Sequence, residues 1–177
     1  MKISVILAHP NPGSFNHAIG AAVIQALGEN RHDIVYHDLY AERFNPVLPF
    51  EEIPRGALLD PVIQAHCAEI AAAEGIVVIH PDWWGQPPAI LKGWVDRVLR
   101  PGVAYRFLEG DRGEGVPVGL LKAKAALVFK HLQHPPGAGD GGLWRPARAA
   151  LEGLHLLALR CSRHPQADVL RCGDEHG

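Results

Sequence analysis

Apolar and polar positions alternate between two patterns along most of the chain. Short runs that are apolar at nearly every position are typical of strands buried on both faces of a sheet. Longer stretches, with apolar residues three or four positions apart, predict helices that bury one face. The predicted strands cover residues 3–7, 33–36, 75–80 and 122–129, and the predicted helices cover about 14–27, 62–73 and 88–99. This alternation predicts an α/β fold with a doubly wound parallel sheet.

Two unusual loops follow the first and third predicted strands. Residues 8–13 and 81–87 are rich in Pro, Gly and Asn, which are residues that form turns. In parallel sheets, ligands bind beyond the carboxyl ends of the strands, where the chain changes direction. We therefore expect a ligand at these two loops.

The first loop leads into the start of a predicted helix. Free backbone N–H groups and the helix dipole favour an anion at such a junction, and His9, Ser14 and Asn16 add polar side chains. The loop lacks the lysine of a P-loop, which argues against nucleoside triphosphate hydrolysis. The alternative is a plain turn in which Ser14 or Asn16 caps the helix and Phe15 fills the core.

The second loop carries two adjacent tryptophans, Trp83 and Trp84. Exposed aromatic rings favour association, so a planar ring system bound beside them would cover them. Packing into the core or a subunit interface is the alternative for either ring alone. We expect Trp94 to be part of the core, and the charged residues Lys92, Asp96 and Arg97 to be solvated or paired across helix turns.

Composition limits the classes of partner. The 177 residues are 47% hydrophobic and 20% charged, with a formal net charge of −2, so no overall field attracts nucleic acid or anionic lipid. Three cysteines in no dense framework favour a reducing compartment. No run of eighteen apolar residues occurs, and we expect a cytoplasmic protein.

Several stretches together resemble the NAD(P)H:quinone oxidoreductase (DT-diaphorase-like) family of flavodoxin-like flavoproteins. They are Leu-Ala-His-Pro-Asn-Pro-Gly-Ser-Phe-Asn-His-Ala at 7–18, Asp-Leu-Tyr-Ala at 38–41, Phe-Asn-Pro at 44–46, His-Pro-Asp-Trp-Trp-Gly-Gln-Pro-Pro-Ala-Ile-Leu-Lys-Gly-Trp-Val-Asp-Arg-Val at 80–98, and Gly-Val-Ala-Tyr-Arg-Phe at 102–107. The resemblance covers residues 1 to about 129 and implies a flavodoxin-like sheet with strand order 2-1-3-4-5.

The resemblance also implies roles for individual residues. The positions matching those that hold the flavin are His9, Ser14, Phe15, Asn16, Ala18, Pro81, Asp82, Trp83, Trp84 and Gly85. Trp84, Gly85 and Tyr105 match positions beside the flavin ring and the substrate face, which makes them the candidate catalytic residues.

The implied reaction is a transfer of hydride from NAD(P)H, through a flavin, to a quinone-type acceptor. The cofactor would be FMN or FAD, the donor NADH or NADPH, and the protein a homodimer. Two alternatives stay open: a non-catalytic regulatory subunit of a potassium-efflux transporter, and an inactive truncated or frameshifted member of the family.

Composition changes sharply after residue 129. Residues 130–177 contain no Ile, Phe or Tyr and one Val, so they form an atypical tail in which residues 154–159 are the only candidate fifth strand. Codons read one base later from residue 130 can encode Asn-Thr-Ser-Asn-Thr, a polar loop of the kind the family places there. We therefore interpret the tail as a frameshift product and expect weak flavin binding. We expect no metal site in the tail, although Cys161, His164, Cys172 and His176 have suitable spacings.

Overall fold

The computed structural model describes residues 1–107, 117–131, 154–163 and 170–174, the last two segments by their backbone alone. A six-stranded sheet has the order β2-β1-β3-β6-β7-β8. Its strands are β1 (Lys2–Leu7), β2 (Asp33–Asp38), β3 (Gly75–Pro81), β6 (Ala125–His131), β7 (Leu154–Arg163) and β8 (Leu170–Asp174). The pairs among β2, β1, β3 and β6 are parallel, which confirms the predicted doubly wound sheet and the order of its first four strands.

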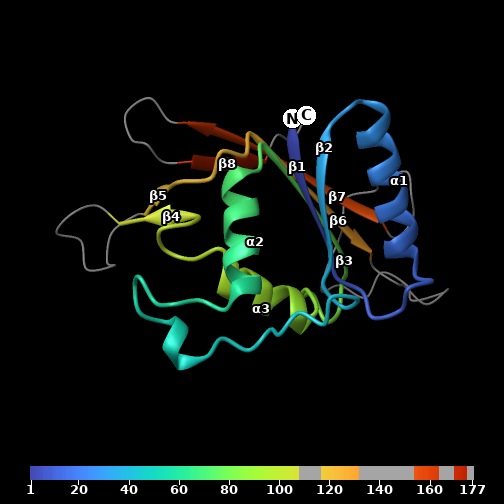
Figure 1. Cartoon of the computed structure of the whole chain (residues 1–177). Coiled ribbons are helices and arrows are strands. Elements are labelled where there is room, and N and C mark those ends of the chain that lie inside the picture. Colours follow the sequence, from blue (N-terminus) through green and yellow to red (C-terminus); the bar gives the residue numbers. More distant parts are fainter. Residues whose placement is uncertain (108–116, 132–153, 164–169, 175–177) are drawn as a thin grey trace.

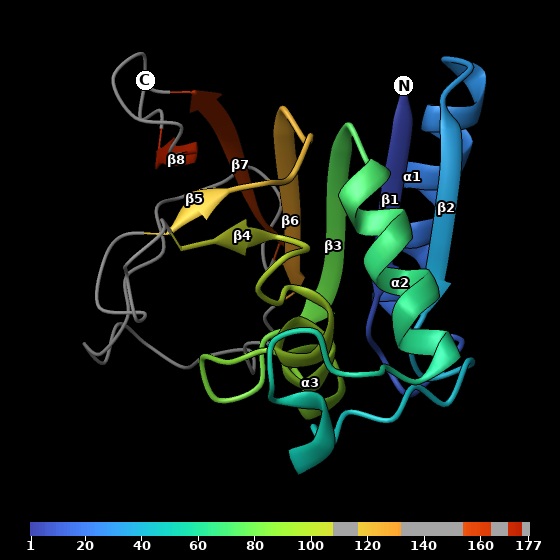
Figure 2. The ribbon, with the colours of Figure 1, turned by 60° about the vertical axis from the view of Figure 1, so that its left-hand side comes forward.

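Helices cover both faces of the sheet (Figures 1 and 2). They are α1 (Phe15–Glu29), α2 (Pro61–Ala72) and α3 (Ala89–Val98), with a short 3₁₀ turn, η1 (Phe50–Glu52), before α2. On one face, α1 packs on alternate residues of β1 and β3, whereas α2 and α3 bury the other face around Ile6 and Trp94. Within the part of the chain that the structure describes, none of the helices combines the length and apolar character needed to cross a membrane.

The fifth strand differs in direction from a doubly wound parallel sheet. A strand does begin at Leu154, as the sequence predicts, but β7 pairs antiparallel with β6 and β8 pairs antiparallel with β7. An antiparallel neighbour needs no helical crossover, whereas a parallel one does. The polar loop was expected from residue 130; residues 130 and 131 instead belong to β6, and 132–153 lie outside the described residues, as do the side chains of Cys161, His164, Cys172 and His176.

The stretch between α3 and β6 contains a small two-stranded sheet. Its strands are β4 (Tyr105–Arg106) and β5 (Val118–Gly119), paired antiparallel. Residues 108–116, between these strands, lie outside the described part of the chain.

Charged residues of α3 correct one prediction. Lys92 and Asp96 pair across one helix turn as expected, with Nζ 2.5 Å from Oδ1. Arg97, however, is buried and pairs with Glu52 of η1. Its partner lies 45 positions away in sequence, so helical spacing could not reveal it. Trp94 is buried, as predicted, and Cys67 is buried as well.

Candidate functional site

The loop after β1 is held in place by its own side chains. The Asn11 Oδ1 atom accepts from Gly13 N at 3.0 Å, and the Ser14 N–H donates to the Asn11 carbonyl at 3.0 Å. Ser14 is the N-cap of α1, as predicted, and its Oγ accepts from His17 N at 3.3 Å. No acidic residue lies in the first turn of α1, so the positive end of the helix dipole stays uncompensated there.

A series of hydrogen-bonded side chains connects the start of α1 to the end of β2. His17 Nδ1 lies 2.8 Å from Ser14 Oγ, and His17 Nε2 lies 2.9 Å from Asp38 Oδ2. The other oxygen of Asp38 accepts from the backbone N–H groups of Tyr40 and Ala41. Both nitrogens of His17 are therefore used in positioning, and the anchor fixes α1 against the end of β2.

The loop after β3 makes a tight turn that exposes Trp84. Trp83 and Gln86 exchange two backbone hydrogen bonds of 3.0 Å, and the two central residues, Trp84 and Gly85, have φ angles of 59° and 77°. This is a type I′ turn, for which Asn-Gly is the favoured pair. A tryptophan in this conformation costs about 1–2 kcal/mol, and the Trp84 ring is 101% exposed. Stability alone does not explain a strained and fully exposed ring, and strain of this kind gathers at functional sites.

Asp82 and Asn16 present buried polar atoms that lack partners. The Asp82 Oδ2 atom lies 2.6 Å from Lys130 Nζ, and Asp82 N donates to the carbonyl of His131 at 2.7 Å. Asp82 Oδ1 and Asn16 Oδ1 are buried, and neither finds a hydrogen-bond partner among the described residues. An unpaired buried acceptor costs about 1–3 kcal/mol, so both atoms call for a ligand or water that donates to them.

One cavity of 410 Å³ connects the two loops. The volume is in the range of about 300–1,000 Å³ that is usual for small-molecule sites. Its lining comes from the ends of β1, β3 and β6 and the start of α1: His9, Ser14, Phe15, Asn16, Pro81, Asp82, Trp83, Trp84 and His131. His9 and Trp83 bring the two loops together, with ring centroids 6.2 Å apart.

The electrostatics of the cavity favour neutral His9. Burial lowers the pKa of His9. The hydrogen bond with the Asn11 backbone raises this pKa in part, and the nearby His17 and His131 lower it further. At neutral pH this ring therefore offers a neutral donor or acceptor to a ligand. The negative charge of the Asp82 carboxylate is neutralised by the ammonium group of Lys130. It therefore does not repel an anion bound at the start of α1.

The predicted site residues divide into two groups. His9, Ser14, Phe15, Asn16, Pro81, Asp82, Trp83 and Trp84 line the cavity together. Gly85 directly follows the lining residue Trp84, and Ala18 lies two positions after Asn16, but neither is part of the lining. Tyr105 sits in β4, where its ring contacts Phe107 at 5.7 Å.

Sequence reasoning missed His131 and Lys130. His131 lines the cavity, and Lys130 pairs with Asp82. Both stand at the carboxyl end of β6, next to β3, so the rule that ligands bind at strand ends could have found them. The change of composition at residue 130 drew attention to the tail and away from this end of the strand.

Comparison with known proteins agrees with the fold. The model of a family described as having a flavodoxin-like fold matches residues 1–159. A protein of Haemophilus influenzae described as an uncharacterized NAD(P)H oxidoreductase is 40% identical over 133 residues, which cover 73% of this chain and 63% of that protein. The NAD(P)H dehydrogenase (quinone) 1 of Rattus norvegicus is 33% identical over 122 residues, 58% of this chain and 44% of that protein.

A solved structure has a similar fold. The NAD(P)H:quinone oxidoreductase from Methanothermobacter marburgensis has a TM-score of 0.66 and 29% identity, covering 80% of this chain and 71% of that chain. The chain thus spans between about two fifths and two thirds of the length of the two curated relatives above.

Proposed function

The chain belongs to the family with the flavodoxin-like fold, and on that premise we propose that it is a flavin-dependent NAD(P)H oxidoreductase that reduces quinone-type acceptors. The observation that carries this proposal is the convergence of two loops, far apart in sequence, on one cavity that joins a helix N-terminus to exposed tryptophans. The relatives named above as NAD(P)H and quinone oxidoreductases support it.

The residues present fit a flavin. Phosphate would lie at the start of α1, where the N–H groups of the first turn and the side chains of Ser14, Asn16 and His9 converge. The flat ring would lie on the loop after β3, against Trp83 and Trp84. The two unpaired oxygens, of Asn16 and Asp82, need donors, and the ribityl hydroxyls and ring N–H of a flavin offer them. FMN and FAD share these groups.

The protein supplies binding and orientation, while a bound flavin supplies the redox chemistry by accepting hydride from NAD(P)H and passing two electrons to the acceptor. The type I′ turn holds the Trp84 ring away from the core, so one face is available to the cofactor or to a substrate ring. Gly85, next in the turn, allows close approach of the backbone. Tyr105 lies outside the lining of the cavity. We place it on the substrate side because the resemblance to the family implies that role.

A second copy of the chain would complete the assembly. The connection between β2 and α2, with the first turn of α2, exposes apolar side chains that a monomer leaves in water: Val47, Leu48, Phe50, Ile53, Leu58 and Val62. Burying such a surface in a homodimer is favourable. Light scattering in solution tests this, and a monomer at micromolar concentration contradicts it. The buried free thiol of Cys67 agrees with a cytoplasmic location.

The atypical tail limits the proposal for this polypeptide. We propose that residues 130–177 include a frameshift and that the chain as written retains flavin weakly. The coding DNA around codon 130 tests the first statement. If the shifted codons contain stops, or encode no amphipathic helix between 130 and 160, it is wrong. Stoichiometric flavin retained through gel filtration contradicts the second.

The functional test measures NADH and NADPH oxidation with and without menadione, after loading with excess flavin. Menadione-dependent oxidation is the expected result. The Asn16→Ala variant should weaken flavin binding about five- to tenfold, because one buried hydrogen bond is worth about 1–1.5 kcal/mol. Asn30→Ala removes an amide at the other end of α1, where Asn30 Nδ2 donates to Ala26 O, and should bind flavin as the parent does. Equal affinities for both variants would contradict the proposed site.

A further inference from the structure

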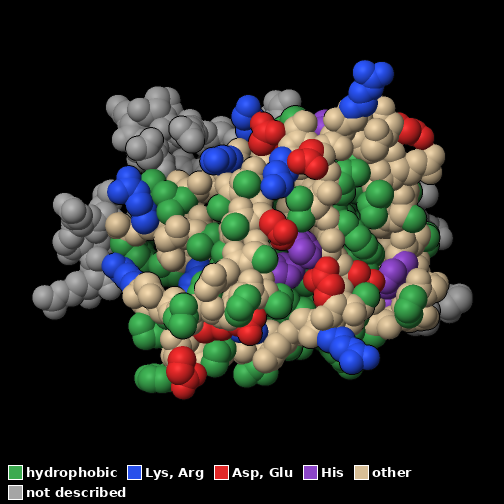
Figure 3. Space-filling view, viewed as in Figure 1, with side chains coloured by type: hydrophobic (Ala, Val, Ile, Leu, Met, Phe, Trp, Pro, Cys, Tyr) green, Lys and Arg blue, Asp and Glu red, His purple; other side chains and the backbone are tan. Residues whose placement is uncertain are grey.

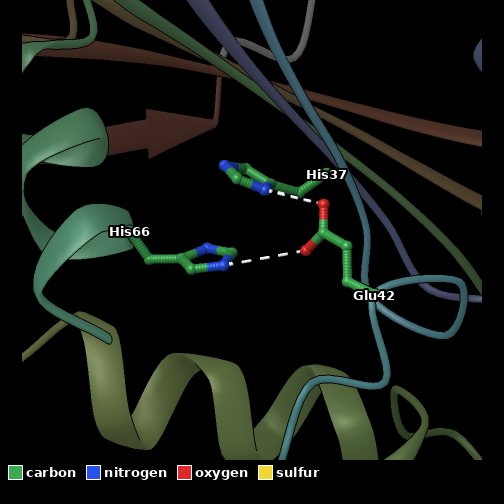
Figure 4. A group of neighbouring side chains, drawn as sticks. All are labelled: His37, Glu42 and His66. Carbon is green, nitrogen blue, oxygen red and sulfur yellow. Dashed lines mark hydrogen bonds and ion pairs between the residues drawn. The ribbon is translucent and has the colours of Figure 1, made fainter. Parts of the chain in front are cut away.

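His37, Glu42 and His66 form a compact cluster away from the flavin cavity (Figure 4). His37 lies near the end of β2, Glu42 in the turn that follows, and His66 on α2. The His37 Nδ1 atom lies 2.9 Å from Glu42 Oε1, and His66 Nε2 lies 3.7 Å from Glu42 Oε2. One nitrogen or oxygen from each of the three residues lies within 4.8 Å of the others.

These distances suit a common metal ligand set. Two donors at about 2.1 Å from a tetrahedral Zn²⁺ ion stand roughly 3.4 Å apart, and the distances above bracket that value. Two imidazoles with one carboxylate favour zinc and its neighbours in the first transition row over Ca²⁺ or Mg²⁺. Small rotations of the side chains would bring the three donors onto one ion.

His37 is already oriented as metal-bound histidines are. Its other nitrogen, Nε2, lies 2.8 Å from Glu69 Oε2, on α2. In metal sites such a carboxylate accepts the second ring N–H, fixes the tautomer and increases the basicity of the ligand. With Glu69, the cluster offers two carboxylates to balance a dication.

The site is open on one side. The His66 side chain is 4% exposed and that of His37 14% exposed, whereas that of Glu42 is 37% exposed. Figure 3 shows histidine at the surface between α2 and β2, with acidic side chains beside it. An ion could enter past Glu42 and keep a water molecule as its fourth ligand.

Trp94 places one condition on the site. The indole Nε1–H donates to His66 Nδ1 at 3.1 Å, so that nitrogen carries a lone pair and the ring proton sits on Nε2. Metal binding through Nε2 would move the proton to Nδ1, where it would face the indole N–H. Metal binding therefore costs this buried hydrogen bond, and the loss lowers the affinity for the ion.

We propose that His37, Glu42 and His66 bind a divalent transition-metal ion, Zn²⁺ being the best match, and that the ion braces β2 against α2. Burial, with the neighbouring His37, lowers the pKa of His66 to about 4, which keeps this ring neutral at neutral pH. His37 lies just before the connection 39–60, Glu42 lies within it and His66 lies on the helix that follows it. A metal ion held by all three would therefore also stabilise that connection.

The test is a Zn²⁺ titration of the full chain by calorimetry, with Co²⁺ absorption as a probe of coordination. We expect one equivalent of Zn²⁺ that disappears in His37→Ala and weakens at least tenfold in Glu42→Gln. The matched controls, His32→Ala and Glu51→Gln, should keep it. A site unchanged by His37→Ala or Glu42→Gln, or no binding at millimolar Zn²⁺, would overturn the proposal.

Trp94→Phe provides the sharper test. It removes the opposing N–H while keeping an aromatic ring in the core, so the affinity for Zn²⁺ should rise several-fold. Unchanged or weaker affinity would remove His66 from the ligand set and refute the three-residue site. Circular dichroism shows whether the variant is folded, and His66→Gln, expected to lose the equivalent of Zn²⁺, repeats the test without a change at Trp94.

Discussion

Arg97 and Glu52 form a buried ion pair that ties the β2–α2 connection to α3. Arg97 Nε donates to Glu52 Oε2 at 3.0 Å, and Arg97 Nη2 donates to Glu52 Oε1 at 2.5 Å. A third donor, Nη1, reaches the Asn45 carbonyl at 2.7 Å. The two side chains are 6% and 5% exposed, so water screens the pair little.

Replacing Arg97 by Met should destabilise the protein strongly. The change leaves the Glu52 carboxylate buried without its partner, and breaking a buried pair this way costs about 3–5 kcal/mol. The Asn45 carbonyl loses its donor as well. For a chain of this size each kcal/mol lowers Tm by roughly 2–4 °C, so a fall of about 10 °C is expected.

The assay is urea unfolding of four proteins: the parent, Arg97→Met, Glu52→Leu and the double variant. The double variant should lose much less than the sum of the single losses, because it leaves no unpaired charge. Lys92→Met on the same helix breaks an exposed pair, 63% and 40% exposed, and serves as the control. It should cost at most about 0.5 kcal/mol.

Two results would refute this reasoning. One is a loss below about 1 kcal/mol for Arg97→Met, which would mean that the pair is solvated. The other is additivity of the single variants, which would show that Arg97 and Glu52 act independently.

Three further predictions concern the backbone and the pH dependence of stability. Trp84→Asn gives the turn its favoured pair and should raise the free energy of unfolding by about 1 kcal/mol while weakening flavin binding; a loss of stability would mean that the ring packs. Gly93→Ala should cost about 1–3 kcal/mol or more, because its Cβ would stand 2.2 Å from Pro46 O, whereas Gly28→Ala meets no atom within 4 Å and should stabilise α1 by up to about 1 kcal/mol. Equal thermal shifts for these two variants would contradict the close approach. Burial lowers the pKa of His80 below its ordinary value of 6.5. Below about pH 6.5 the unfolded chain therefore binds more protons than the folded chain, and the free energy of unfolding decreases as the pH is lowered. In His80→Gln, denaturant unfolding should show a shallower fall between pH 7 and 5, and an identical slope would disprove the assignment.

Much of the fold was predictable because its signals are local. The apolar runs at 3–7 and 75–80 marked strands buried on both faces, and Ser14 marked the start of α1, where it is the N-cap. A parallel sheet brings strand ends to one edge, so the meeting of the first and third loops followed from topology. The direction of β7 did not follow, because strand direction depends on how the chain returns to the sheet.

What the sequence by itself determined, then, was the order of elements and the edge of the sheet where a ligand site lies. Tertiary structure decided the rest, because it pairs residues that no spacing relates. Burial joined Arg97 to Glu52, the end of β6 brought His131 to the cavity, and the packing of α2 on β2 placed His66 beside His37. Removing polar groups from water costs free energy unless they find partners, and both the removal and the partners exist only once the chain has folded.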